Sequence, residues 1–182
     1  PERADDGSPE TAGGLSNINL FRELTLYYDL DKKIGKTGLS FTAGIFPRRM
    51  AEGHYSRAFF SDSLRFYDNN LEGILVKVRR PKAAFEIGCD WMGQYGTFRR
   101  ERFMIFSAGE GKVAPVLSLG YAAYLYHFSC SETSGGVVDN VLINPYLRFD
   151  FARKTGFQTL SFSLGWLQAM QHDREFVGHY VF

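Results

Sequence analysis

The four histidines, His54, His127, His172 and His179, are the first residues in this sequence whose type could support chemistry. No two of them have the i, i+2 or i+4 spacing of a metal-binding pair, and no HExxH motif is present. His127 lies close to Ser129, a combination that a hydrolase embedded in a membrane barrel could use. A catalytic triad is defined by its geometry in space, and no GxSxG motif accompanies this pair. We therefore predict a protein that is not an enzyme and that uses no cofactor or metal, with the hydrolase kept as a minor alternative.

Charged residues that alternate with apolar ones form the second group with chemical potential. They are candidates for lining a solute pathway: Glu72, Lys77, Glu86, Asp90, Arg148 and Asp150. Charges on one face of a sheet can pair across strands, or they can set the field that a passing solute meets. Both signs are present, so the set predicts neither an anion nor a cation preference. The longest connection, Pro47–Asn70, is rich in charge, and loops of this length are often functional. We expect it to make a surface contact or to fold into a lumen.

Composition excludes several classes of protein. The chain has 21 Lys and Arg against 20 Asp and Glu, a formal net charge of +1, which argues against nucleic-acid binding. No run of apolar residues approaches the ~20 that a membrane-spanning helix needs. The two cysteines, Cys89 and Cys130, fit neither a disulfide framework nor a metal motif.

The elements that must position these residues are β-strands, because the apolar residues recur with a period of two. Residues 1–17 are polar, lack periodicity and are predicted to be a flexible leader. From Ile18 onward, about nine strands are predicted up to residue 182, the last of them starting near Phe176 and incomplete. Leu117, Leu119, Tyr121 and Leu125, for example, all fall on one face. A helix would scatter such residues around its axis.

The predicted connections alternate between short and long. In chain order they are Asp31–Gly38, Pro47–Asn70, Arg79–Ala83, Met92–Glu101, Gly109–Lys112, Ser129–Asn140, Ala152–Gly156 and Gln171–Arg174. Alternate connections of an up-and-down meander lie at the same edge of the sheet. One edge should therefore be trimmed and the other elaborated, which is typical of transmembrane β-barrels. Two aromatic bands are expected to flank the aliphatic middle: Tyr28, Phe85, Phe151 and Phe157 at the short turns, and Phe46, Trp91, Phe128 and Trp166 at the long loops.

Several phrases of the sequence resemble a known family. They are GIFPRR, SDSLRFYDNNLEG, DWMGQYGTFRRERFMIFSAG, YLYHFS and VDNVLINPYLRFDF, which lie between residues 44 and 151. These segments resemble those of porin-like outer-membrane β-barrels of Gram-negative bacteria of the Bacteroides type. The resemblance implies that the chain is an N-terminal portion of a larger barrel. It carries no catalytic or binding residue with it.

The sequence thus predicts an all-β protein, an antiparallel up-and-down meander that is a small transmembrane β-barrel or part of one. The expected function is a porin-like pore or wall protein in the outer membrane, with membrane lipid and small solutes as partners. The alternatives are a soluble antiparallel barrel or sandwich that binds a ligand, or the embedded hydrolase. The direction of the apolar face separates the membrane readings from the soluble one, because a soluble sheet turns that face inward.

Overall fold

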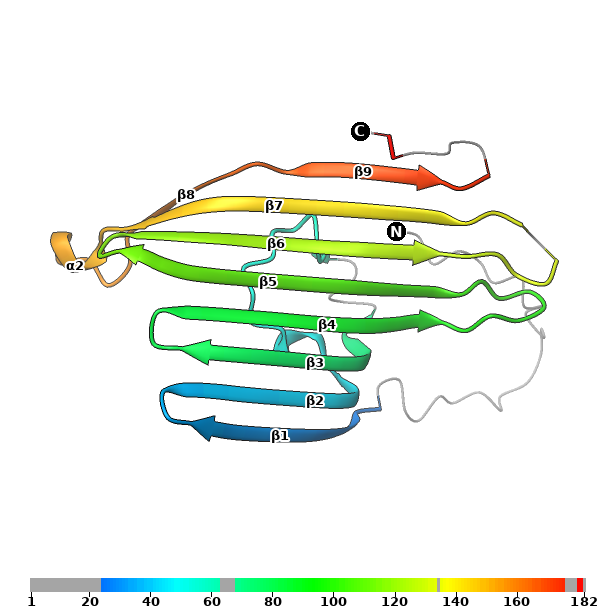
Figure 1. Ribbon diagram of the computed structural model, residues 1–182, viewed down its shortest axis with the longest axis horizontal. Coiled ribbons are helices and arrows are strands. Elements are labelled where there is room, and N and C mark those ends of the chain that lie inside the picture. Colours follow the sequence, from blue (N-terminus) through cyan, green and yellow to red (C-terminus); the bar gives the residue numbers. More distant parts are fainter. Residues whose placement is uncertain (1–23, 63–67, 134, 176–179, 182) are drawn as a thin grey trace, which may run out of the picture.

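Antiparallel strands dominate the computed structural model, which describes residues 24–62, 68–133, 135–175 and 180–181. The strands are β1 (Leu26–Ile34), β2 (Thr37–Pro47), β3 (Asn70–Arg80), β4 (Ala83–Gly93), β5 (Arg102–Ala114), β6 (Leu117–Phe128), β7 (Val138–Asp150), β8 (Ser161–Gly165) and β9 (Gln168–Asp173). They form one sheet in which each strand from β1 to β8 pairs with its neighbour in sequence (Figure 1). The prediction of an all-β antiparallel meander is confirmed.

The last two strands, β8 and β9, are two segments of one interrupted strand that pairs with β7. Both β8 and β9 pair with β7, β8 opposite Tyr146–Asp150 and β9 opposite Val138–Ile143. The register is the same on either side of the break. Pro145 of β7 lies at the interruption, and proline has no N–H group to donate to a sheet. The Trp166 N–H still donates to the Pro145 carbonyl at 3.0 Å, which keeps the two parts aligned.

Tight turns occupy one edge of the sheet. β1 and β2 are joined by Gly35 and Lys36, β3 and β4 by Pro81 and Lys82, and β5 and β6 by Pro115 and Val116. Gly35 has φ +58°, a conformation that favours glycine. The fourth connection at this edge contains the short helix α2 (Ala152–Thr155).

Two of the predicted turns prove too wide and a third is misplaced. Most of Asp31–Gly38 belongs to β1 and β2, and three residues of Arg79–Ala83 belong to β3 and β4. All of Gly109–Lys112 belongs to β5, because the turn lies at Pro115 and Val116. Glycines and charges in these segments resemble turn signals, yet they pair across strands, as Lys33 does with Gly38 and Gly111 with Leu119.

The opposite edge carries the long connections, 48–69, 94–101 and 129–137. The predicted contrast between a trimmed and an elaborated edge is confirmed for the first six connections. It fails at the seventh, predicted as the short turn Ala152–Gly156, because that connection spans residues 151–160. The first of these connections starts with the 3₁₀ turn η1 (Arg48–Met50) and then crosses one face of the sheet. We call residues 48–69 the crossing loop.

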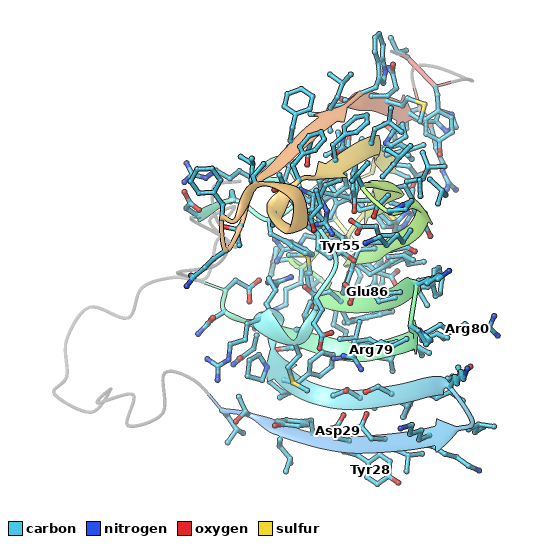
Figure 2. All side chains as sticks on the ribbon, turned by 90° about the vertical axis from the view of Figure 1, so that its left-hand side faces the viewer. Tyr28, Asp29, Tyr55, Arg79, Arg80 and Glu86 are labelled. Carbon is cyan, nitrogen blue, oxygen red and sulfur yellow. The ribbon has the colours of Figure 1, made fainter. Side chains whose placement is uncertain are left out.

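The two faces of the sheet differ in chemistry and in exposure. The apolar face points outward, with Leu119, Phe162 and Leu164 exposed by 48%, 57% and 60%. The other face, which we call the inner face, lies against the crossing loop, and Figure 2 shows Tyr55 of the loop on the same side of the sheet as Glu86. Along residues 117–125 of the predicted exposed face, Leu119 is exposed and Leu117, Tyr121 and Leu125 are partly exposed. Strand β8, at the side of the sheet, is exposed on both faces. The predicted exposure is therefore confirmed in part.

The buried core lies between the crossing loop and the inner face, not between two sheets. Phe59 and Phe60 of the loop pack with side chains from five strands: Phe46, Leu71, Leu75, Met104, Phe106, Ala108, Ala122 and Leu142. Phe46 is fully buried in this core, so the prediction that it belongs to an aromatic band on the outside is wrong. Side chains alternate between the two faces of a strand, so Phe46 lies with Thr42, four residues before it, on the inner face, and the adjacent Ile45 lies on the outer face.

The sheet is open at both sides within the described residues. There β1 pairs with β2 alone, and β8 and β9 pair with β7 alone. A single bridge joins Gln171 to Val181. The predicted leader 1–17, the start of the first strand at Ile18 and most of the ninth strand near Phe176 lie outside the described residues. In the part of the chain that the structure describes, no helix has both the length and the apolar character needed to cross a membrane.

Candidate functional site

Aromatic packing holds the crossing loop on the inner face. The ring of Tyr55 lies 4.8 Å from that of Phe60 and 5.9 Å from that of Phe106, measured between centroids. Phe106 can lie flat across β4 because residue 88 is glycine, where a Cβ atom would come within 2.4 Å of the Phe106 ring. The loop backbone approaches equally closely at Gly53, whose missing Cβ would lie 2.4 Å from the Cβ of Ala108.

A buried ion pair holds the start of the loop. Arg48 Nη1 lies 2.8 Å from Asp90 Oδ2, and the two side chains are exposed by only 4% and 3%. Arg48 also donates to the carbonyl oxygens of Asp68 and Asn70 at 3.1 and 3.0 Å. Asp90 in turn accepts the backbone N–H of Glu72 at 3.0 Å. The guanidinium therefore ties both ends of the crossing loop to the wall of the sheet.

Glu52 provides a second attachment point. Its carboxylate accepts hydrogen bonds from Lys77 Nζ at 3.0 Å and from Arg79 Nε at 2.9 Å, and it forms an ion pair with each. Lys77 is buried and also donates to the Met50 carbonyl at 3.0 Å. The hydrogen bond from Arg79, followed by that from Lys77, holds the pKa of Glu52 below its usual range in spite of partial burial. The loop thus supplies the counter-charge for two cations on β3.

Glu86 binds the loop backbone directly. Its two carboxylate oxygens accept the N–H groups of Glu52 and Gly53, both at 2.9 Å. Tyr55 is partly buried nearby, and this burial, with the carboxylate of Glu86 as a secondary cause, raises the pKa of its hydroxyl. Buried carboxylates are stable when they accept such hydrogen bonds.

A third charged group lies beyond the loop. Arg148 on β7 forms an ion pair with Glu110 on β5, and Tyr146 donates its hydroxyl to the same carboxylate at 3.0 Å. These side chains reach across β6 because residue 120 is glycine, where a Cβ atom would lie 2.2 Å from the Tyr146 ring.

The six sequence candidates are not placed alike. Lys77, Glu86, Asp90 and Arg148 lie on the inner face, and each has the polar partners described above. Glu72 does not: it is exposed on the outer face beside Ile74, so its expected position in the lumen is wrong. It is separated from Lys77 by an odd number of positions, which places the two side chains on opposite faces of β3.

Asp150 lies at the end of β7 and is exposed. It accepts the N–H of Ala152, the first residue of the short helix α2, at 3.0 Å.

Sequence reasoning missed the partners that complete these groups. Arg48 and Glu52 lie in the crossing loop, where no periodicity indicates a direction, and Glu110 lies in a segment predicted to be a turn. For Arg48 and Glu52 the only sequence signal was the concentration of charge in a long loop.

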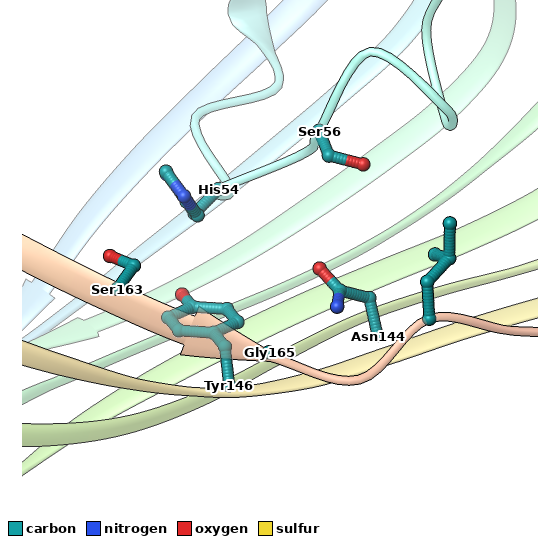
Figure 3. Close-up of a pocket in the computed structure, with 7 residues that line it drawn as sticks. His54, Ser56, Asn144, Tyr146, Ser163 and Gly165 are labelled. Atoms are coloured by element: carbon teal, nitrogen blue, oxygen red, sulfur yellow. The ribbon is translucent and has the colours of Figure 1, made fainter.

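A hollow of about 270 Å³ lies between the crossing loop and the last strands. Figure 3 shows the side chains around it, His54 and Ser56 from the loop and Asn144, Tyr146 and Ser163 from β7 and β8. The His54 ring lies 5.2 Å from that of Tyr146. Leu167 completes the wall.

The outer face carries a row of ring contacts near the long connections. Trp91 stacks on Phe103 at 5.8 Å, and Phe103 stacks on His127 at 4.7 Å. His127 Nδ1 lies 2.6 Å from Asp139 Oδ1, whose other oxygen accepts a hydrogen bond from Arg174 at 2.8 Å. The Ser129 hydroxyl donates to the Cys130 sulfur at 3.7 Å. The Ser129 hydroxyl is thus directed to Cys130, and the His127 ring to Asp139.

The fold and site together define a curved antiparallel wall with an apolar outside and a charged, loop-covered inside. Comparisons of the chain with protein-family models, curated proteins and solved structures found no match.

Proposed function

We propose that this chain forms the wall of an outer-membrane β-barrel of a Gram-negative bacterium and passes small solutes. The observation that carries the proposal is the direction of its side chains. Apolar residues are exposed on the outer face, and the buried charges Arg48, Lys77, Glu86 and Asp90 lie on the inner face; the buried Asp139 lies in the outer-face row at the long-connection edge.

The distribution is the reverse of that in a soluble sheet. Soluble monomers rarely expose a contiguous apolar patch larger than a few hundred Å². Here exposed apolar side chains occur on neighbouring strands across the sheet: Phe41, Ile74, Phe85, Ile87, Ile105, Leu119, Ile143, Phe162 and Leu164. Hydrocarbon is the environment that such a surface fits, because it removes the cost of apolar exposure to water.

The inner face has the opposite requirement. Arg or Lys directed into hydrocarbon costs about 2–4 kcal/mol at the bilayer midplane. Lys77 and Arg148 are directed inward instead, and each has an acidic partner there.

The row from Trp91 to Arg174 supports a membrane boundary at the long-connection edge. Aromatic girdles flank the apolar band of membrane barrels, and charges follow where the headgroups begin. Trp91 and Phe103 provide the aromatic part, and the ion pairs of Asp139 with His127 and Arg174 provide the polar part.

The crossing loop supports a narrowed passage. It is held by Arg48, Glu52 and the N–H groups bound to Glu86, so its position against the wall is fixed by several independent contacts. Solutes would pass between this loop and the remaining wall. Paired charges of both signs provide hydrogen bonding along that route without a strong preference for one ion sign.

Tryptophan fluorescence tests the proposal directly, because both tryptophans of the chain, Trp91 and Trp166, are exposed on the outer face. The chain is refolded into phosphatidylcholine vesicles whose acyl chains carry bromine, a contact quencher. The Trp91→Phe and Trp166→Phe variants, each with one tryptophan left, should both be strongly quenched relative to unbrominated vesicles.

A third variant serves as the control. It lacks both native tryptophans and carries Tyr55→Trp in the crossing loop, where the new side chain faces the lumen. Its fluorescence should not respond to bromine. If the chain stays out of the vesicles, or if only Tyr55→Trp is quenched, the membrane proposal fails and the soluble module becomes the better reading.

A further inference from the structure

The hollow beside the crossing loop has unused hydrogen-bonding groups around it. Among the described residues, the hydroxyls of Ser56 and Ser163 have no hydrogen-bond partner. The Asn144 side-chain N–H donates to the Trp166 carbonyl at 2.9 Å, which leaves the Asn144 side-chain oxygen available as an acceptor. Small-molecule sites in proteins typically combine a few such polar groups with apolar or aromatic walls.

Among the described residues, the lining includes no carboxylate, lysine or arginine. Glu110 and Arg148 pair with each other, and Tyr146 directs its hydroxyl to Glu110. A ligand in the hollow would therefore meet hydroxyl, amide and imidazole groups, the faces of two aromatic rings and the side chain of Leu167. Hydroxyl and amide groups can both donate and accept hydrogen bonds, as a polyhydroxylated ligand requires.

Size limits the ligand further. Sites for drug-sized molecules have volumes of about 300–1,000 Å³, and this hollow, at about 270 Å³, lies just below that range. One small ring matches this volume.

We propose that this hollow binds a small, neutral, polyhydroxylated solute of monosaccharide size. The solute hydroxyls bind Ser56, Asn144 and Ser163, and its C–H face packs on the exposed ring of His54, which itself lies against Tyr146 at 5.2 Å. The inference deepens the proposed function, on which it rests, by naming the class of solute that the lumen holds.

Binding is tested with glucose as the probe, measured by saturation-transfer NMR and titration calorimetry on the folded full chain in detergent micelles. Glucosamine and glucuronate, its cationic and anionic counterparts, are measured alongside. Ser56→Ala should raise the dissociation constant for glucose about three- to tenfold, the effect of losing one neutral hydrogen bond. Ser163→Phe places an aromatic ring in the hollow and should abolish binding.

Ser40→Ala is the matched control, because Ser40 lies on the inner face of β2, far along the sheet from β7. It should leave glucose binding unchanged. The inference is overturned if the folded chain does not bind glucose, if Ser163→Phe binds it normally, or if a charged counterpart binds more tightly. The assay requires no vesicle, so its failure is distinguishable from failure of the membrane proposal, which the bromine experiment reports.

Discussion

The buried pair between Arg48 and Asp90 offers the sharpest test of how the crossing loop is held. Asp90→Asn keeps the size of the side chain and an oxygen for the Glu72 N–H, and it removes the negative charge. Arg48 then remains almost fully buried with Asp68 as its remaining acidic neighbour, at 3.5 Å and half exposed.

Breaking a buried ion pair by removing one partner costs about 3–5 kcal/mol, because the other charge stays buried without compensation. The cost here should fall near the lower end, about 3 kcal/mol, since Arg48 keeps its bonds to two carbonyl oxygens. With a urea dependence of about 1–3 kcal/mol per molar, the unfolding midpoint should fall by about 1–3 M.

Urea unfolding of the chain in micelles, followed by tryptophan fluorescence, measures this midpoint. The control is Asp62→Asn, because Asp62 pairs with Arg57 in the same loop at 3.7 Å and both side chains are exposed. Exposed pairs contribute about 0–1 kcal/mol, so this midpoint should barely move. Equal effects of the two substitutions would refute the reasoning. A further check is Arg48→Met combined with Asp90→Leu, which should be more stable than Asp90→Asn because no buried charge is left alone.

Three other predictions follow from the same contacts. Gly53→Ala places a Cβ atom against Ala108 and should lower the free energy of unfolding by about 1–3 kcal/mol, measured by the same urea titration. The hydrogen bond from Arg79 lowers the pKa of Glu52 in the folded state. The stability that ionised Glu52 contributes is therefore present above pH 4.5 and is lost as the pH falls through the lowered pKa of the folded state. Glu52→Gln should reduce this loss of stability between pH 7 and pH 3. Leu119→Arg on the outer face should disfavour insertion by about 2–4 kcal/mol if it lies near the midplane, measured by vesicle flotation.

Each of these has a matched comparison. Gly96→Ala should be close to neutral, because its Cβ atom would meet only the Cβ atom of Arg99, at 3.8 Å, an ordinary van der Waals contact. Arg148→Ala, on the inner face, should leave insertion unchanged, and a stronger defect there than in Leu119→Arg would mean that the faces are assigned the wrong way round. For Glu52, an unchanged acid response in Glu52→Gln would show that another group titrates.

The sequence predicted the strands and most of their directions because both depend on neighbouring residues. Side chains alternate from one face of a strand to the other, so the apolar face of β6, for example at Leu119, follows from position alone. The same alternation rule also predicts the position of Glu72. Its distance of five residues from Lys77 assigns it to the outer face, although its charge suggested the lumen. Turn limits were less certain, because glycine and charge occur both in turns and at the paired ends of strands.

The partners of the inner charges were decided by the tertiary structure. Asp90 pairs with Arg48, and Lys77 with Glu52, because the crossing loop folds back over the inner face. Loop residues have no alternation that fixes their direction, and the path of the loop depends on aromatic contacts such as that between Tyr55 and Phe106. The sequence by itself determined which face of the wall is apolar, since that is a local property. Only the tertiary structure decided which charges meet and where a hollow remains, since both depend on the packing of segments that are distant along the chain.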